Sequence, residues 1–265
     1  MRNHISVTAE APTSRIFHDE LINDEVFGAL PHRLVYSARS SGLRLFPFPH
    51  FYATEVFPAA ILEAIIKLWP AECQFKSIGD TQRVTAGRYR ERLITSLDTL
   101  VETLDADSEQ YLFWSRLHRS LASDELIAHL IEWLWPYIKA ERTLPENVTL
   151  YSDVVLTDDK AGYKLGPHTD SPERLLTILF YVPQSNANPS AGTSIYVPKL
   201  PNYDAKVSAM HLDQQDFYAV YKAPFIQNAS FGFVVGDRSF HGAEQIHNLS
   251  VPRRQIQYSI RLRPA

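Results

Sequence analysis

Short β-rich runs fill the second half of the sequence, and they constrain the possible folds more than any other feature of the chain. Gly, Pro, Asn and Asp separate each run from the next. Many short strands with such spacing are typical of an all-β sandwich or barrel rather than of alternating βαβ units. We therefore predict a jelly-roll barrel, also called a double-stranded β-helix. The runs span residues 148–157, 175–182, 193–197, 231–235 and 255–262.

The first half of the chain shows helical periodicity instead. Apolar residues recur at helical spacing in residues 58–69 and, as a longer stripe, in residues 123–138. Residues 91–104 show a weaker pattern of the same kind. Ser108 and Ser123 each precede an apolar stripe and suit helix N-caps. Such stripes normally mark helices that pack on another layer, so we assign them no chemistry.

The composition shows no linker between the two halves, so we expect a single integrated domain over residues 1–265. Residues 1–45 mix polar and short apolar groups without a steady period, which predicts a loosely organised lead-in that wraps the domain. Residues 46–145 would form a helical support, and residues 146–265 the jelly-roll core. The predicted fold class is therefore mainly β with a helical N-terminal half.

The composition also argues against several classes of function. The formal net charge is -4 and no long Lys/Arg run is present, which argues against nucleic acid as the partner. No stretch of about 18 apolar residues exists, so no membrane span is expected. Cys73 is the only cysteine, which fits a reducing, cytoplasmic environment and excludes zinc sites built from several thiolates.

The clearest local signal for chemistry is the sequence GPHTD, which contains His168 and Asp170. Residues i and i+2 of an extended segment project to the same face, so these two side chains are able to bind one metal ion together. His168 offers an imidazole nitrogen, and Asp170 offers a carboxylate oxygen. Two protein ligands hold a metal weakly, so a third ligand is expected from elsewhere in the chain.

His241 is the natural third ligand, because it follows the strand-like run at residues 231–235 and a barrel can bring two such strands together. His211 and His247 remain alternatives, although neither follows such a run. Two histidines and one carboxylate on one side of a metal leave its other side open. This is the arrangement expected of non-haem iron(II) sites.

The last β-rich run has one polar and one apolar face. Its polar face begins with Arg253, whose guanidinium is suited to pair with a carboxylate through two charge-assisted hydrogen bonds. A dicarboxylate ligand inside the barrel would explain such a polar row. Arg254 is the alternative partner, but its parity places it on the apolar face. Arg253, Gln255, Gln257 and Ser259 share the polar face, and Ile256, Tyr258, Ile260 and Leu262 the apolar one.

These positions resemble the Fe(II)/2-oxoglutarate-dependent dioxygenase family, whose pattern is His-x-Asp, a distal His, and then an Arg or Lys. In this sequence the corresponding residues are His168, Asp170, His241 and Arg253. The resemblance covers about residues 148–262 and is closest to the prolyl-hydroxylase-like branch. It implies that the first three residues bind iron(II) and act in catalysis, and that Arg253 binds the far carboxylate of 2-oxoglutarate.

The resemblance implies roles for three further residues. Tyr181 is the candidate for a tyrosine that also bonds the 2-oxoglutarate carboxylate, and Thr177, on the same face of its run, is a second candidate contact to the cosubstrate. Tyr163 resembles another pocket-lining tyrosine of that branch. The implied reaction consumes O2 and 2-oxoglutarate, releases succinate and CO2, and hydroxylates the substrate.

No motif identifies the primary substrate. The lack of a nucleic-acid signal favours a small molecule, with a sugar-like or amino-acid-like group, over a peptide. Arg88, Arg90, Arg174 and Arg238 are candidates for contact with an anionic substrate. The alternative function is a cupin-type metal enzyme, or a sugar-binding jelly roll that uses no 2-oxoglutarate, but such proteins typically carry a His-x-His pair that this chain lacks.

Overall fold

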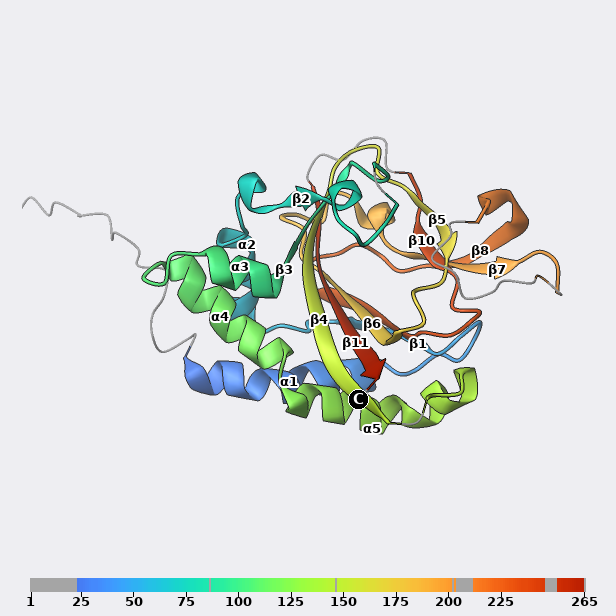
Figure 1. Ribbon diagram of the computed structural model, residues 1–265, viewed down its shortest axis with the longest axis horizontal. Helices are drawn as coiled ribbons and strands as arrows, with labels where there is room; N and C mark the ends of the chain where they lie inside the picture. The colour runs from blue at the N-terminus through green and yellow to red at the C-terminus, as the bar shows by residue number, and fades with distance from the viewer. Residues whose placement is uncertain are drawn as a thin grey trace, which may run out of the picture.

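The computed structural model describes residues 23–85, 87–145, 147–201, 203, 212–245 and 252–264, and the strands in this part of the chain form two antiparallel sheets (Figure 1). The larger sheet contains β1 (His50–Thr54), β2 (Lys76–Ser77), β3 (Arg92–Ser96), β4 (Val148–Asp159), β6 (Arg174–Tyr181), β9 (Ala229–Val234) and β11 (Arg253–Pro264). The smaller sheet contains β5 (Leu165–His168), β7 (Ser194–Pro198), β8 (Phe217–Lys222) and β10 (His241–Ala243). The strand orders are β1-β9-β6-β11-β4-β3-β2 and β5-β10-β7-β8.

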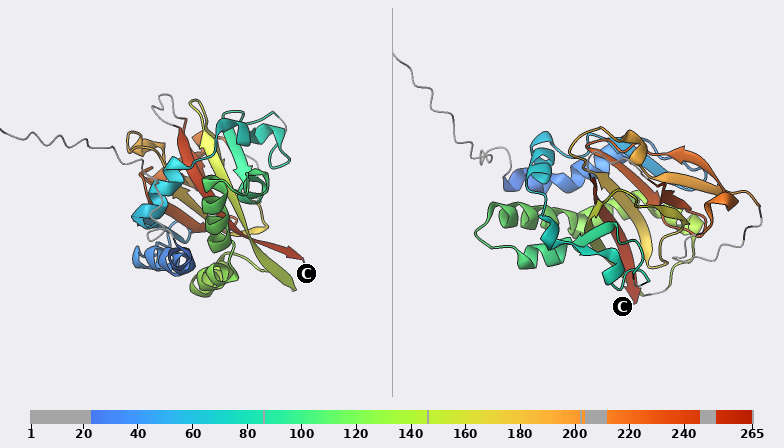
Figure 2. Two further views of the ribbon diagram at one scale, coloured as in Figure 1. Left: turned by 90° about the vertical axis from the view of Figure 1, so that its left-hand side faces the viewer. Right: turned by 90° about the horizontal axis from the view of Figure 1, so that it is seen from above.

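The helices pack on the larger sheet. They are α1 (Asp24–Ser40), α2 (Ala59–Lys67), α3 (Leu97–Thr103), α4 (Glu109–Leu121) and α5 (Asp124–Glu141). Side chains of β4, β6 and β11 share one hydrophobic core with all five helices. The inward face of these strands, together with β5 and β10 of the smaller sheet, lines a cavity, so the site lies on the side of the larger sheet away from the helices (Figure 2).

Strand β11 lies between β4 and β6 and shows the predicted two faces. Ile256, Tyr258 and Ile260 belong to the core shared with the helices. Gln255 and Gln257 line the cavity on the other face. Successive side chains of an extended chain point to opposite faces, so the apolar residues of β11 all face the helices and the polar residues all face the cavity.

Three helices agree with the predicted helical segments, namely α2, α4 and α5. The Ser108 hydroxyl accepts a hydrogen bond from the backbone N–H of Tyr111 at the start of α4. The Ser123 hydroxyl caps α5 in the same way, through the N–H of Leu126. Both serines therefore satisfy a backbone donor that has no partner within its helix.

Helix α1 corrects the expectation of a loosely organised lead-in for residues 24–40, whereas residues 1–22 of the expected lead-in lie outside the described residues. Its N-cap is Asn23, whose side chain accepts from the N–H of Val26. Its buried side chains, including Phe27, Leu30 and Leu34, form a helical stripe in the same core as α4 and α5. Gly28 and Pro31 interrupt this stripe in the sequence, and packing against two helices compensates for their low helix propensity.

The segment 91–104 corrects the prediction of one continuous helix. Its first part is strand β3, which pairs with β4, and only the residues from Leu97 onward form helix α3. Ser96 marks the change, because its hydroxyl accepts from the N–H of Thr99 and caps the helix. Pairing with a distant strand therefore overrides the weak local helical pattern.

The strands do not close into the predicted barrel within the described ranges. No strand of the smaller sheet pairs with a strand of the larger one. Strands β5 and β10 are only 4 and 3 residues long, and their register shifts between His241 and Ala243, so neither extends far enough to join the two ladders. Among the described helices, none is long and apolar enough to cross a membrane.

Candidate active site

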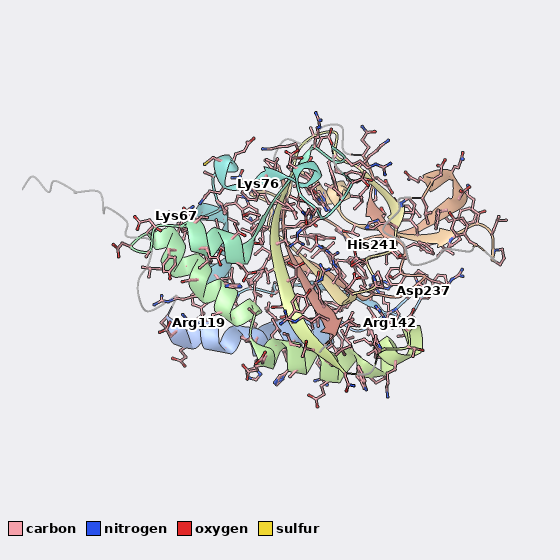
Figure 3. The ribbon with its side chains drawn as sticks, in the orientation of Figure 1. Lys67, Lys76, Arg119, Arg142, Asp237 and His241 are labelled. Carbon is pink, nitrogen blue, oxygen red and sulfur yellow. The ribbon has the colours of Figure 1, made fainter. Side chains whose placement is uncertain are left out.

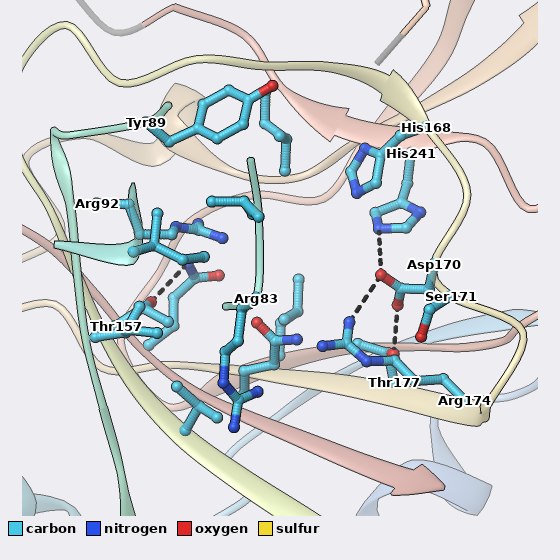
Figure 4. Close-up of a pocket in the computed structure, with 18 of the residues that line it drawn as sticks. Arg83, Tyr89, Arg92, Thr157, His168, Asp170, Ser171, Arg174, Thr177 and His241 are labelled. Atoms are coloured by element: carbon cyan, nitrogen blue, oxygen red, sulfur yellow. Dashed lines mark hydrogen bonds and ion pairs between the residues drawn. The ribbon is translucent and has the colours of Figure 1, made fainter. Parts of the chain in front are cut away.

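Strand pairing brings the predicted metal ligands together. His168 ends β5 and lies directly opposite His241 of β10, and Asp170 follows two residues later. The two imidazole rings have centroids 4.3 Å apart. All three side chains are buried, and their potential ligand atoms lie within 4.8 Å of one another (Figure 4). A short antiparallel ladder thus closes the long sequence separation between the two histidines.

Backbone carbonyls orient both imidazole rings. Nδ1 of His168 lies 3.0 Å from the carbonyl oxygen of Gly166, and Nδ1 of His241 lies 2.9 Å from that of Ser239. A carbonyl oxygen can only accept, so these contacts assign the proton to Nδ1 in each neutral ring. Nε2 is then the nitrogen that could bind a metal, and in His241 it lies 3.9 Å from Oδ1 of Asp170. Carbonyl partners of this kind are typical of metal-binding histidines.

Two side chains hold the carboxylate of Asp170. The hydroxyl of Thr177 donates to Oδ2 over 2.6 Å, and Nη1 of Arg174 donates to Oδ1 over 2.8 Å. Burial opposes ionisation of this carboxyl group, but Arg174, the two histidines and the Thr177 hydrogen bond outweigh it and hold its pKa below the usual range. Asp170 is therefore an anion, in which Oδ2 accepts a hydrogen bond from Thr177 and Oδ1 accepts one from the positively charged Arg174.

The two histidines are neutral at neutral pH. Burial, together with the neighbouring His241, lowers the pKa of His168 to about 3. Burial also lowers the pKa of His241. A histidine must be neutral to bind a metal, so neither residue has to lose a proton first. The three residues together offer two neutral nitrogens and one anionic oxygen.

Arg253 lies in the cavity wall, where it is 1% exposed. Its Nη1 donates to Oδ2 of Asp159 over 2.7 Å, and its Nε donates to the carbonyl oxygen of Ala191 over 2.5 Å. Arg92 of β3 binds the same carboxylate of Asp159 through bonds of 2.6 and 2.8 Å. Two buried guanidinium groups therefore share one buried carboxylate.

Arg254 points away from the cavity. Its Nε donates to Oδ2 of Asp158 over 3.2 Å, and its guanidinium carbon lies 5.4 Å from the centre of the Trp69 ring. Trp69 belongs to the core shared with the helices. Of the two candidate anion-binding arginines, only Arg253 therefore has access to the cavity.

The structure gives the two other predicted cosubstrate residues partners within the protein. The hydroxyl of Tyr181 donates to Oγ1 of Thr193 over 2.8 Å, and burial raises the pKa of this tyrosine to about 12. Thr193 lines the cavity. Thr177 also lines the cavity, with its hydroxyl on Asp170. Tyr163 is buried in the wall, and the guanidinium carbon of Arg92 lies 4.3 Å from the centre of its ring.

The cavity has a volume of about 670 Å³, within the range of roughly 300–1,000 Å³ that is typical of small-molecule sites. Its wall contains several charged residues that the sequence did not single out, among them Arg83, Arg92, Asp153 and Arg261. The parity of β11 predicts an inward position for Arg261, since it continues the polar row. No local signal indicates the others, because their partners come from distant strands.

The other candidates from the sequence lie elsewhere. Arg88, Arg90 and Arg238 are exposed and do not line the cavity, whereas Arg174 does. The alternative third ligands, His211 and His247, are outside the described residues. A second possible metal-binding group, His32, Glu125 and His129, connects α1 with α5 on the surface. Figure 3 draws the side chains on the ribbon and labels His241 of the buried group.

No protein-family model matches the chain, and no curated protein matches it. Similar solved structures include a prolyl-4-hydroxylase from Pseudomonas putida, at 12% identity over 88% of this chain and 99% of that chain, with a TM-score of 0.48. A second is the non-haem α-ketoglutarate-dependent epimerase SnoN from nogalamycin biosynthesis, at 16% identity over 88% and 84%, with a TM-score of 0.47. A third is a 2OG-Fe(II) oxygenase family oxidoreductase from Burkholderia pseudomallei, at 8% identity over 89% of each chain, with a TM-score of 0.42.

Proposed function

We propose that this chain is an iron(II)- and 2-oxoglutarate-dependent oxygenase that hydroxylates a small organic substrate and releases succinate and CO2. The observation that carries the proposal is the buried group of His168, Asp170 and His241 at the wall of a cavity that also contains a buried Arg253. We further propose that the two sheets form a double-stranded β-helix framework and that residues 1–265 act as one domain.

The donor set of the three residues fits iron(II). Two imidazole nitrogens and one carboxylate oxygen form the facial triad of non-haem iron oxygenases, and the described part of the chain places no thiolate beside them. Thr177 occupies Oδ2 of Asp170, and Oδ1, which accepts from Arg174 and lies 3.9 Å from Nε2 of His241, is the oxygen that would bind the metal. The ligands lie in the cavity wall, so the metal would keep open positions toward the cavity.

The surroundings of Arg253 fit a dicarboxylate. Arg92 and Arg253 carry two positive charges against the single negative charge of Asp159; Arg253 and Asp159 are almost completely buried, and the side chain of Arg92 is 12% exposed. Buried charge without compensation is costly, so a further carboxylate is favoured here. Oε1 of Gln255, the next inward residue of β11, is buried and has no hydrogen-bond partner, and a bound ligand would supply one.

Bound iron(II) and 2-oxoglutarate would supply the activation of dioxygen that oxidises a substrate C–H bond. The chain's own residues provide the conditions for this chemistry. Thr177 and the carbonyl oxygens of Gly166 and Ser239 fix the orientation of the metal ligands. The cavity between the sheets separates the reacting groups from bulk water, which limits side reactions.

The proposal is tested by anaerobic titration of the metal-free protein with Fe(II) and 2-oxoglutarate, following the weak visible charge-transfer band of their chelate. We expect a band that needs both components and disappears in His168→Ala. His129→Ala, in the surface group, is the matched control and should keep the band. Iron binding without any band would exclude the cosubstrate assignment and favour the cupin-type alternative.

A further inference from the structure

Three arginines line the cavity beside Asp170, and none of them is a proposed ligand of iron or of 2-oxoglutarate. They are Arg83, Arg174 and Arg261, and we call them the arginine cluster. Arg174 of β6 and Arg261 of β11 are register partners on adjacent antiparallel strands, and both line the cavity. Like charges placed directly opposite each other destabilise a strand pair unless an anion lies between them. Figure 4 shows Arg83 and Arg174 among the side chains that surround the pocket.

The carboxylates near this cluster do not neutralise it once a metal is bound. Asp153 accepts from Arg83 over 2.9 and 3.0 Å and from Arg261 over 3.1 Å. Arg174 is paired with Asp170, which is the proposed metal ligand. Glu173 lines the rim but is exposed. When Asp170 binds a cation, Asp153 and Glu173 are the carboxylates that the described residues place beside the three guanidinium groups, so one positive charge remains without a carboxylate.

Two donors of the cluster lack partners. Nε of Arg174 and Nε of Arg261 are buried and make no hydrogen bond to any residue that the structure describes. The neighbouring arginines differ, because Nε of Arg92, Arg253 and Arg254 each donates to a carboxylate or a carbonyl oxygen. Buried N–H groups are normally satisfied, and at a ligand site an unsatisfied one indicates a missing acceptor.

We propose that the primary substrate is a small organic acid or amino acid whose carboxylate binds to Arg174 and Arg261, with Arg83 at the rim of the cavity. A monoanion matches the single surplus charge, and a planar carboxylate suits paired guanidinium donors. Arg174 contacts Asp170 over 2.8 Å, so the bound carboxylate would lie close to the metal ligands and hold a neighbouring C–H bond near the reaction centre. The catalytic part of this inference rests on the proposed function, whereas the anion site requires only a cation on Asp170 and no bound 2-oxoglutarate.

The first test uses acetate as a minimal carboxylate. Thermal unfolding of the anaerobic protein, saturated with Fe(II) and 2-oxoglutarate, is measured with sodium acetate, with sodium chloride at equal ionic strength, and with acetamide. Acetate at about ten times its Kd should raise the Tm of the wild type by about 2–4 °C, and the other two additives should not. Arg261→Gln should lose this increment, and Arg254→Gln, on the same strand but outside the cavity, should keep it. An acetate effect equal to that of chloride, or one that persists in Arg261→Gln, would refute the anion site.

The second test measures succinate release with a panel of small carboxylic acids and free amino acids beside their primary amides. The acids should stimulate release and the amides should not, and Arg261→Gln should raise the KM of an active acid about tenfold while the half-saturating 2-oxoglutarate concentration is unchanged. Equal stimulation by an amide would contradict the proposal. The chelate band distinguishes failure of the oxygenase assignment from failure of the anion site. If no band forms but acetate still raises the Tm of the wild type and not that of Arg261→Gln, the oxygenase assignment fails and the anion site stands.

Discussion

The hydrogen bond from Thr177 to Asp170 gives the sharpest test of how the site is built. Thr177→Val keeps the shape of the side chain and removes only the hydroxyl that donates to Oδ2 over 2.6 Å. Both residues are buried, with exposed fractions of 2% and 7%. A hydrogen bond to a charged group contributes about 1.5–3 kcal/mol, and about 1.4 kcal/mol corresponds to a factor of ten in binding. We therefore expect the affinity for Fe(II) to fall by about 10–100-fold, as is typical when a partner of a metal ligand is removed.

Anaerobic Fe(II) titration of Thr177→Val and the wild type measures this change, and far-UV circular dichroism checks that the fold is retained. Thr157→Val is the matched control, because Thr157 lies on β4 in the same cavity wall and makes only a 3.4 Å contact with Gln255. The half-saturating concentration of 2-oxoglutarate at saturating iron should be nearly unchanged. If Thr177→Val bound iron normally but required much more 2-oxoglutarate, the hydroxyl would act on the cosubstrate, as the resemblance implies, and the orientation of Asp170 would not depend on it.

Three further predictions concern the other parts of the site. Arg253→Ala should raise the 2-oxoglutarate concentration needed for half-maximal chelate absorbance at least about tenfold, and an unchanged requirement would contradict its assigned role. Gly242→Ala should weaken Fe(II) binding, because a Cβ there would lie 2.4 Å from the carbonyl oxygen of Leu165 and push β10 away from β5; iron titration that matches the wild type would show that the ladder tolerates this shift. The metal-free protein should lose stability as the pH falls from 6.5 toward 3, since the depressed pKa of His168, about 3, means that the unfolded chain binds a proton in this window and the folded chain does not. Urea unfolding at neutral pH and at about pH 5 tests this prediction, and His168→Gln should reduce the difference.

Local patterns predicted most of the second half of the chain. The predicted strand at residues 255–262 appears as β11, and its apolar and polar faces point to the helices and to the cavity. Such features depend on the two-residue repeat of an extended chain, which is independent of the partner strand. Helix α1 and strand β3 were not predicted, because distant residues stabilise them: α4 and α5 in one case and β4 in the other.

The sequence by itself determined the spacing of His168 and Asp170 and the inward position of Arg253 on the polar face of its run, and it left Arg254 as an alternative anion-binding residue. Only the tertiary structure placed His241 opposite His168, and only it brought Arg92 onto Asp159 and the arginine cluster around Asp153. The physical reason is that residue spacing sets the direction of a side chain within one strand. Whether two charges from different strands meet depends on register and on the packing of the two sheets, which no local pattern contains.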